Sequence, residues 1–161
     1  MAIEIERKFL VTGDGWRAEV TGSAALRQGY LSTSAKATVR IRIFDDERAV
    51  LTLKGPTSGI SRAEFEYDVP MADGLAMLDM ARPNVVEKRR HMVPHAGLTW
   101  EVDVFEGAHA GLVMAEVELD RADQRIDLPE WVGREVSHDD RYANASLSRT
   151  PGVPPVDPDA A

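Results

Sequence analysis

Hydrophobic and polar residues alternate along most of this chain, the pattern of strands that pack one face and expose the other. No internal repeat, heptad or solenoid pattern interrupts the alternation. The alternating runs are separated by breaks rich in Gly, Pro, Asp and Ser. They predict eight strands, over residues 3–11, 25–32, 37–44, 48–54, 61–69, 84–93, 98–105 and 112–119.

Helical patterns are short and few. They predict helices over residues 14–20, 71–81, 121–127 and 139–147. In the second of these, Met71, Leu75 and Leu78 share one side, which predicts that this helix covers a sheet face. Eight antiparallel strands with so few helices favour a mainly β (α+β) fold, a closed or nearly closed eight-stranded barrel, because closure removes exposed strand edges.

The length of 161 residues suits one domain with one core, which we predict to span residues 1–148. From Thr150 the sequence reads TPGVPPVDPDAA, with four prolines and no periodic pattern. We therefore predict that residues 149–161 form a disordered tail.

The polar faces of the predicted strands carry charges of one sign side by side. Such pairs are Glu4 and Glu6, Arg40 and Arg42, Glu64 and Glu66, Lys88 and Arg90, Glu101 and Asp103, and Glu116 and Glu118. For any single strand, a solvated outer face explains the pattern. Because like charges adjacent on one face repel, the repeated segregation favours something bound between them.

In a closed barrel these faces point into one lumen. Paired carboxylates there need a cation, and hard oxygen ligands suit Mg²⁺ or Mn²⁺. Arg and Lys from neighbouring strands need an anion, and the Arg fork fits phosphate oxygens. Carboxylates for a metal beside a basic ring for oxyanions predict a polyphosphate site.

Amino-acid composition limits which molecules this protein is expected to bind. The formal net charge of −8 argues against nucleic-acid binding, although an acidic exterior is compatible with a basic interior. The absence of cysteine excludes disulfides and thiolate metal sites. The charged N-terminal sequence lacks a signal-peptide core, and no apolar run approaches the ~18 residues of a membrane span, so we expect a cytoplasmic protein with no membrane partner.

Ordered motifs along the chain resemble one known family. EIERKFLV at 4–11 carries an ExExK pattern at Glu4, Glu6 and Lys8, and QGYL, VRIR, LTLKGP, RAEFEY, EKRR, WEVDVFEG, AEVEL and REVSHDDRYANASL follow in order to Leu147. The chain is thereby identified as resembling the CYTH superfamily, the triphosphate tunnel metalloenzymes, and its length is similar to that of the short bacterial inorganic triphosphatases.

The resemblance implies an eight-stranded tunnel with Mg²⁺ or Mn²⁺, two ions, on its acidic residues and triphosphate on its basic ones. It implies these metal ligands: Glu4, Glu6 and Glu116 for one ion, and Glu66, Asp103 and Glu118, with Glu64 as a neighbour, for the other. It implies these phosphate-binding residues: Lys8, Arg40, Arg42, Lys54, Arg62, Lys88, Arg90 and Arg141. For Arg62, a salt bridge at the periphery is an equal alternative to phosphate binding. For Arg141, the alternative is that its side chain only solvates the C-terminal helix.

The expected activity is hydrolysis of the terminal phosphoanhydride of inorganic triphosphate. Tyr30 and Lys54 match a pair associated with this activity in short family members, with barrel filling as the alternative for Tyr30. Rival activities are those of a class IV adenylate cyclase, a thiamine triphosphatase or another nucleoside triphosphatase, and a non-catalytic polyphosphate-binding module. Metal-binding spacing is absent among the histidines. The sequence is compatible with a monomer or a homodimer and with Mg²⁺ or Mn²⁺. It is also compatible with any order of preference among tripolyphosphate, ATP and thiamine triphosphate.

Overall fold

The computed structural model describes residues 2–155. Its strands are β1 (Ile3–Val11), β2 (Gly22–Thr33), β3 (Thr38–Phe44), β4 (Arg48–Lys54), β5 (Ser61–Val69), β6 (Val85–His95), β7 (Leu98–Glu106), β8 (Val113–Glu118) and β9 (Val132–Glu135). Its α-helices are α1 (Met71–Ala81) and α2 (Asn144–Arg149), with 3-10 turns η1 (Arg17–Glu19), η2 (Gly107–His109) and η3 (Asp140–Tyr142).

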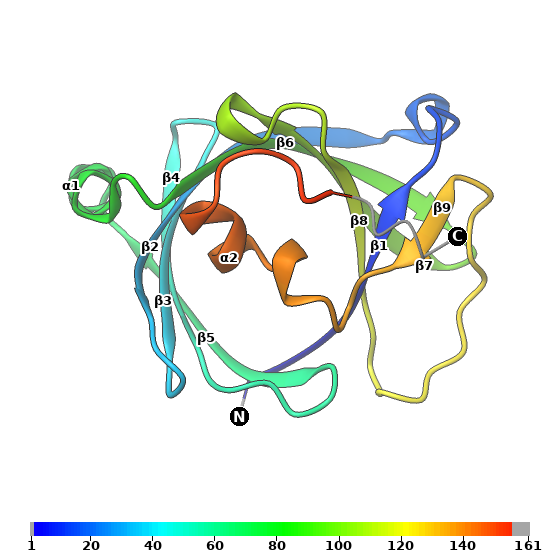
Figure 1. Cartoon of the computed structure of the whole chain (residues 1–161), viewed down its shortest axis with the longest axis horizontal. Helices are drawn as coiled ribbons and strands as arrows, with labels where there is room; N and C mark the ends of the chain where they lie inside the picture. The colour runs from blue at the N-terminus through cyan, green and yellow to red at the C-terminus, as the bar shows by residue number, and fades with distance from the viewer. Residues whose placement is uncertain (1, 156–161) are drawn as a thin grey trace.

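The first eight strands form a closed antiparallel barrel, as the alternation predicted. The order of the sheet is β5-β4-β3-β2-β6-β7-β8-β1-β9, and an additional pairing of β5 with β1 closes the ring. At the closure, Ile3 pairs with Ala63 and Glu4 with Arg62. Figure 1 shows this ring of strands, with α1 outside it and α2 within its outline.

Strand β9 was not predicted. It pairs with β1 alongside β8, with Phe9 opposite Glu135 and Val11 opposite Val132, and the register shifts between the two pairs. The four-residue sequence VGRE is too short to show an alternating pattern. It forms a strand because it extends an edge that β1 already presents.

The helix predictions were correct only in part. Residues 14–20 hold no more than the single turn η1, residues 121–127 form no helix, and residues 139–147 divide into η3 and α2. Helix α1 matches its predicted range, and Met71 and Leu78 pack on the sheet as predicted, whereas Leu75 is 41% exposed. Gly74 and Ala81, both buried, let the helix lie close to the sheet beside these larger side chains.

The barrel has apolar side chains outside and charged ones inside along its middle. Trp16, Trp100 and Val117 belong to one buried cluster, and Ile41, Ile43 and Leu78 belong to another beneath α1. A third cluster joins Phe105 and Met114 to the C-terminal residues Tyr142 and Leu147. It lies at the end of the barrel that η3 and α2 cover, and the charged interior remains beyond it.

The predicted tail lies partly outside the described residues, which end at residue 155. Within the described part, the Gly152 amide donates to the Ala108 carbonyl at 2.9 Å, and the Arg141 guanidinium donates to the Pro155 carbonyl at 3.1 Å. Disorder of residues 149–161 stays a prediction.

Candidate functional site inside the barrel

The barrel encloses a cavity of about 380 Å³. The predicted site residues that line it come from strands β1 to β6 and β8 and are Glu4, Glu6, Lys8, Tyr30, Arg40, Arg42, Lys54, Arg62, Glu64, Glu66, Arg90, Glu116 and Glu118. They converge because strand alternation turns every second side chain inward and the ring then closes. Lys88, Asp103 and Arg141 do not line this cavity.

Lysines separate the carboxylates of the acidic wall. The Lys54 amine lies 3.0 Å from a Glu4 oxygen and 3.2 Å from a Glu64 oxygen. The Lys8 amine lies 3.6 Å from Glu6 and 3.8 Å from Glu116. Burial disfavours the charge on Lys8, but Glu116 and Glu6 outweigh burial and raise its pKa above the ordinary value. Lys8 therefore stays charged inside the barrel.

The carboxylates of this wall nevertheless repel one another. Burial, followed by the charge of Glu116, raises the pKa of Glu6 to about 7. Burial also raises the pKa of Glu4, with a hydrogen bond to Glu64 as the next cause, and it raises the pKa of Glu118. Within residues 2–155, no three acidic or histidine side chains are arranged to hold an ion by themselves. A cation placed here would lower these pKa values.

The opposite wall carries arginines with unused donors. Burial, then the charges of Arg40 and Arg90, lowers the pKa of Arg42 to about 9. The Arg40 Nη2 atom donates to the Thr52 hydroxyl at 3.2 Å, while its buried Nε has no hydrogen-bond partner in the described chain. Buried donors without partners are costly, so this wall is complementary to an oxyanion.

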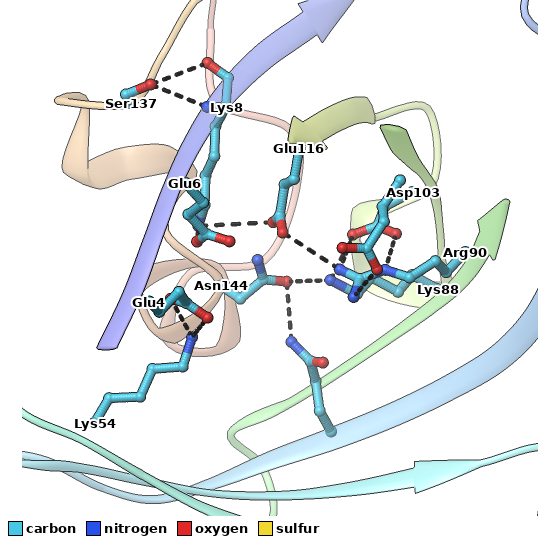
Figure 2. Close-up of polar contacts among 12 residues, drawn as sticks. Glu4, Glu6, Lys8, Lys54, Lys88, Arg90, Asp103, Glu116, Ser137 and Asn144 are labelled. Atoms are coloured by element: carbon cyan, nitrogen blue, oxygen red, sulfur yellow. Dashed lines mark hydrogen bonds and ion pairs between the residues drawn. The ribbon is translucent and has the colours of Figure 1, made fainter. Parts of the chain in front are cut away.

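An ion-pair cluster centred on the buried Asp103 supports the basic wall. Asp103 accepts from Arg90 Nε at 2.8 Å and Nη2 at 2.9 Å, and the Lys88 amine lies 2.7 Å from the same carboxylate. Arg90 also lies 2.8 Å from Glu101 and 3.5 Å from Glu116. Burial alone would raise the pKa of Asp103, but Arg90 and Lys88 reverse that effect and lower it. Figure 2 shows Asp103 enclosed by these two cations.

Comparison with known proteins shows which family the chain belongs to. The model of the CYTH domain matches residues 2–150. The chain belongs to the CYTH domain family. It is 41% identical over 152 residues to the inorganic triphosphatase of Acetivibrio thermocellus, covering 94% of this chain and 96% of that one. It is 37% identical over 152 residues to the inorganic triphosphatase of Nitrosomonas europaea, covering 90% of this chain and 96% of that one.

A solved structure agrees with both relatives. The crystal structure of an inorganic triphosphatase is 33% identical to this CYTH domain, with a TM-score of 0.66, and covers 93% of this chain and 97% of that one. Within residues 2–155, no helix combines the length and apolar character that crossing a membrane requires.

Tyr30 and Lys54 both line the cavity of this CYTH domain, each with its own contacts. The Tyr30 hydroxyl accepts from the Gln28 amide at 3.1 Å, and its side chain is 6% exposed. The Lys54 amine lies between Glu4 and Glu64. A catalytic role for the pair stays a prediction.

The two peripheral arginines differ in position. Arg62 lines the cavity and donates from Nε and Nη2 to the Gly55 carbonyl at 3.0 and 2.7 Å, so its observed partner is a backbone oxygen rather than the salt bridge considered above. Arg141 contacts Asp139 at 2.8 Å and stacks over Tyr142, away from the cavity lining.

Three residues of the interior were not assigned to the site by the sequence reasoning. Glu101 lines the cavity and follows from the alternation that placed Asp103 inward. Gln28 is fully buried and lies in the QGYL motif, two positions before Tyr30. Asn144 begins α2 and lines the cavity, and no spacing rule connects it to a strand.

The tryptophans and histidines do not line the cavity. Trp16, Trp100 and Trp131 belong to the core cluster outside the charged lumen. A thiamine triphosphatase would need an aromatic platform for the cationic head group of its substrate, and these three rings do not form one in the cavity. His91 packs on Trp16 with ring centroids 5.0 Å apart, and the ring of His109 contacts the Leu147 carbonyl at 2.6 Å, so both rings have packing partners outside the cavity.

Proposed function

We propose that this CYTH domain hydrolyses the terminal phosphoanhydride of inorganic triphosphate, releasing orthophosphate and pyrophosphate, and that it does so with a divalent metal. Two relatives that carry the name inorganic triphosphatase match nearly the whole chain at 41% and 37% identity, which supports the proposal. We further propose that it acts in the cytoplasm on a free small molecule.

The observation that carries the proposal is the pairing of opposite walls around one enclosed space. The cavity volume of about 380 Å³ lies in the range of small-molecule sites. The unsatisfied Arg40 Nε and the disfavoured charge of Arg42 favour a polyanion on one side. The raised pKa values of Glu4, Glu6 and Glu118 favour a cation on the other.

The carboxylates fit Mg²⁺ or Mn²⁺ by their chemistry, since both ions prefer oxygen ligands. We propose that Glu4, Glu6, Glu116 and Glu118 hold the metal, with Glu64 and Glu66 as neighbours for a second ion. When bound, such a metal neutralises charge on the phosphates and promotes the ionisation of water.

The chain's own residues then bind and align the substrate. A loose phosphoryl-transfer transition state needs positioning and charge neutralisation more than covalent help. We propose that Lys8, Arg40, Arg42 and Arg90 neutralise phosphate oxygens, with Arg62 at the margin. We propose that Lys54, whose amine lies between Glu4 and Glu64, and the Tyr30 hydroxyl, which also lines the cavity, donate protons or orient water at the terminal phosphate.

We propose a different role for Asp103 and Lys88 from the one that the family resemblance implied. Both Asp103 oxygens already face cations, and neither residue lines the cavity. A carboxylate held in this way acts as a counter-ion that keeps Arg90 oriented toward the substrate. Arg141, paired with Asp139, is expected to act at most on the covering segment.

A substrate panel tests the proposal. Purified protein is stripped with EDTA and assayed for phosphate release from tripolyphosphate, ATP, thiamine triphosphate and pyrophosphate, with Mg²⁺ or Mn²⁺ returned. We expect tripolyphosphate to be cleaved fastest, and only with a metal. Cyclic AMP formed from ATP would indicate a cyclase instead, and tight binding of tripolyphosphate without phosphate release would indicate a binding module.

A further inference from the structure

A chain of hydrogen bonds connects the basic wall to helix α2. Arg42 Nε donates to the side-chain oxygen Oε1 of Gln28 at 2.8 Å, and the side-chain nitrogen Nε2 of Gln28 donates to Asn144 Oδ1 at 3.0 Å. The Lys88 amine donates to the same Asn144 oxygen at 3.1 Å. Figure 2 shows Asn144 beneath Glu6 and Glu116, with its oxygen joined to Lys88 by a dashed line.

The cations fix which way both amides face. Arg and Lys side chains are donors only, so an atom that contacts them must be an acceptor. Arg42 therefore fixes the Gln28 oxygen toward itself and turns the Gln28 nitrogen toward Asn144. Because Lys88 also donates to it, the Asn144 oxygen faces two donors, and flipping the amide would set its NH₂ group against both of them.

In this orientation the Asn144 amide nitrogen points away from Gln28 and Lys88, which donate to the Asn144 oxygen. Asn144 lines the cavity, and within residues 2–155 its nitrogen makes no hydrogen bond. In Figure 2 the nitrogen points away from Lys88, toward the side on which Glu6 and Glu116 lie. Two N–H donors thus face the space that the charged walls surround.

We propose that Asn144 is a substrate-binding residue, whose amide N–H donates to a phosphate oxygen of the bound triphosphate. The inference rests on the proposed function and adds to it a neutral donor supplied by the C-terminal helix. An amide at this place donates to an oxyanion without adding charge between the acidic and basic walls. The C-terminal segment therefore contributes to recognition as well as covering the end of the barrel.

The substitution Asn144→Asp separates recognition from structure. Aspartate keeps an oxygen for Lys88 and Gln28 but replaces the donor with a second acceptor. We expect the variant to stay folded and to show kcat/KM for tripolyphosphate about 10- to 100-fold lower, mainly through a higher KM, since a hydrogen bond to a charged group is lost. Ser146→Ala, on the same helix but off the cavity lining, is the control and should keep wild-type kinetics.

If the wild-type protein cleaves tripolyphosphate and the folded Asn144→Asp variant shows the same kinetics, the inference about Asn144 is wrong while the proposed function stands. If the wild-type protein releases no phosphate from tripolyphosphate, the proposed function fails first. A measurement on the unmodified protein covers the case in which the variant misfolds. Tripolyphosphate is added until the chemical-shift change of the Arg42 NMR resonances saturates. The Asn144 side-chain NH₂ resonances should then have moved, and resonances that stay in place would also refute the proposal.

Discussion

Removing the charge of Asp103 should weaken the fold more than any exposed acidic substitution. Asp103 is 0% exposed, and its carboxylate faces Arg90 at 2.8 Å and Lys88 at 2.7 Å. The substitution Asp103→Asn would keep the side-chain volume but remove the carboxylate paired with Lys88 and leave Arg90 with Glu101 and Glu116 alone. Breaking a buried pair from one side costs about 3–5 kcal/mol, a large share of the stability of a typical domain.

Thermal and urea unfolding followed by tryptophan fluorescence measure this loss, because Trp16 and Trp100 are buried in the native core. For a chain of this size, Asp103→Asn should lower Tm by about 6–20 °C. Asp68→Asn is the matched control, since Asp68 pairs with Arg48 at 2.9 Å on the exposed surface and should change stability by no more than about 0.5 kcal/mol.

The result also decides between two roles for Asp103. A variant that loses stability with and without metal supports the counter-ion role proposed here. A variant as stable as wild type that loses only metal-dependent turnover would refute this reasoning and return Asp103 to the metal ligands that the family resemblance implied.

Two further predictions concern the fold. Gly74→Ala should destabilise by about 1–3 kcal/mol, because the added Cβ would lie 2.4 Å from the Ala49 Cβ and would separate α1 from the sheet, whereas Gly15→Ala, with open space around it, should be neutral within about 0.5 kcal/mol. Equal chemical denaturation midpoints for the two variants would contradict the packing argument. Glu135→Gln should cost roughly 0.5 kcal/mol near pH 7, a figure reduced for solvent screening because the Arg7–Glu135 pair is partly exposed. The hydrogen bond from Arg7 lowers the pKa of Glu135, so its stabilisation is present above the ordinary carboxyl range and is lost as the pH falls through the lowered pKa. Wild type and Glu135→Gln should therefore converge in acid, and a difference that grew on acidification would have the wrong sign.

Alternation along the chain was enough to predict the barrel and its charged interior. Each inward residue such as Arg40 or Glu116 alternates with an apolar one such as Ile41 or Val117, so the period alone assigns the face. Closure follows from the number of strands and from the cost of free edges.

Side-chain partners could not be predicted in this way. Alternation turns Asp103 and Glu118 inward alike, but only the folded register sets Asp103 beside Arg90 on the neighbouring strand. Asn144 lies on a helix more than a hundred residues from Gln28, and nothing in the local sequence indicates their contact. Strand β9 was missed because its pairing depends on the edge that β1 presents rather than on its own four residues.

A comparison of inward and outward arginines tests whether the barrel interior is the active site. Arg40 is buried and lines the cavity, whereas Arg89 is exposed on the outer face of β6. With fluorescence confirming that both variants fold, Arg40→Gln should lower kcat/KM for metal-dependent cleavage of tripolyphosphate by about 100-fold or more, and Arg89→Gln should leave it unchanged. Equal activity in the two variants would show that the active site lies outside the barrel interior.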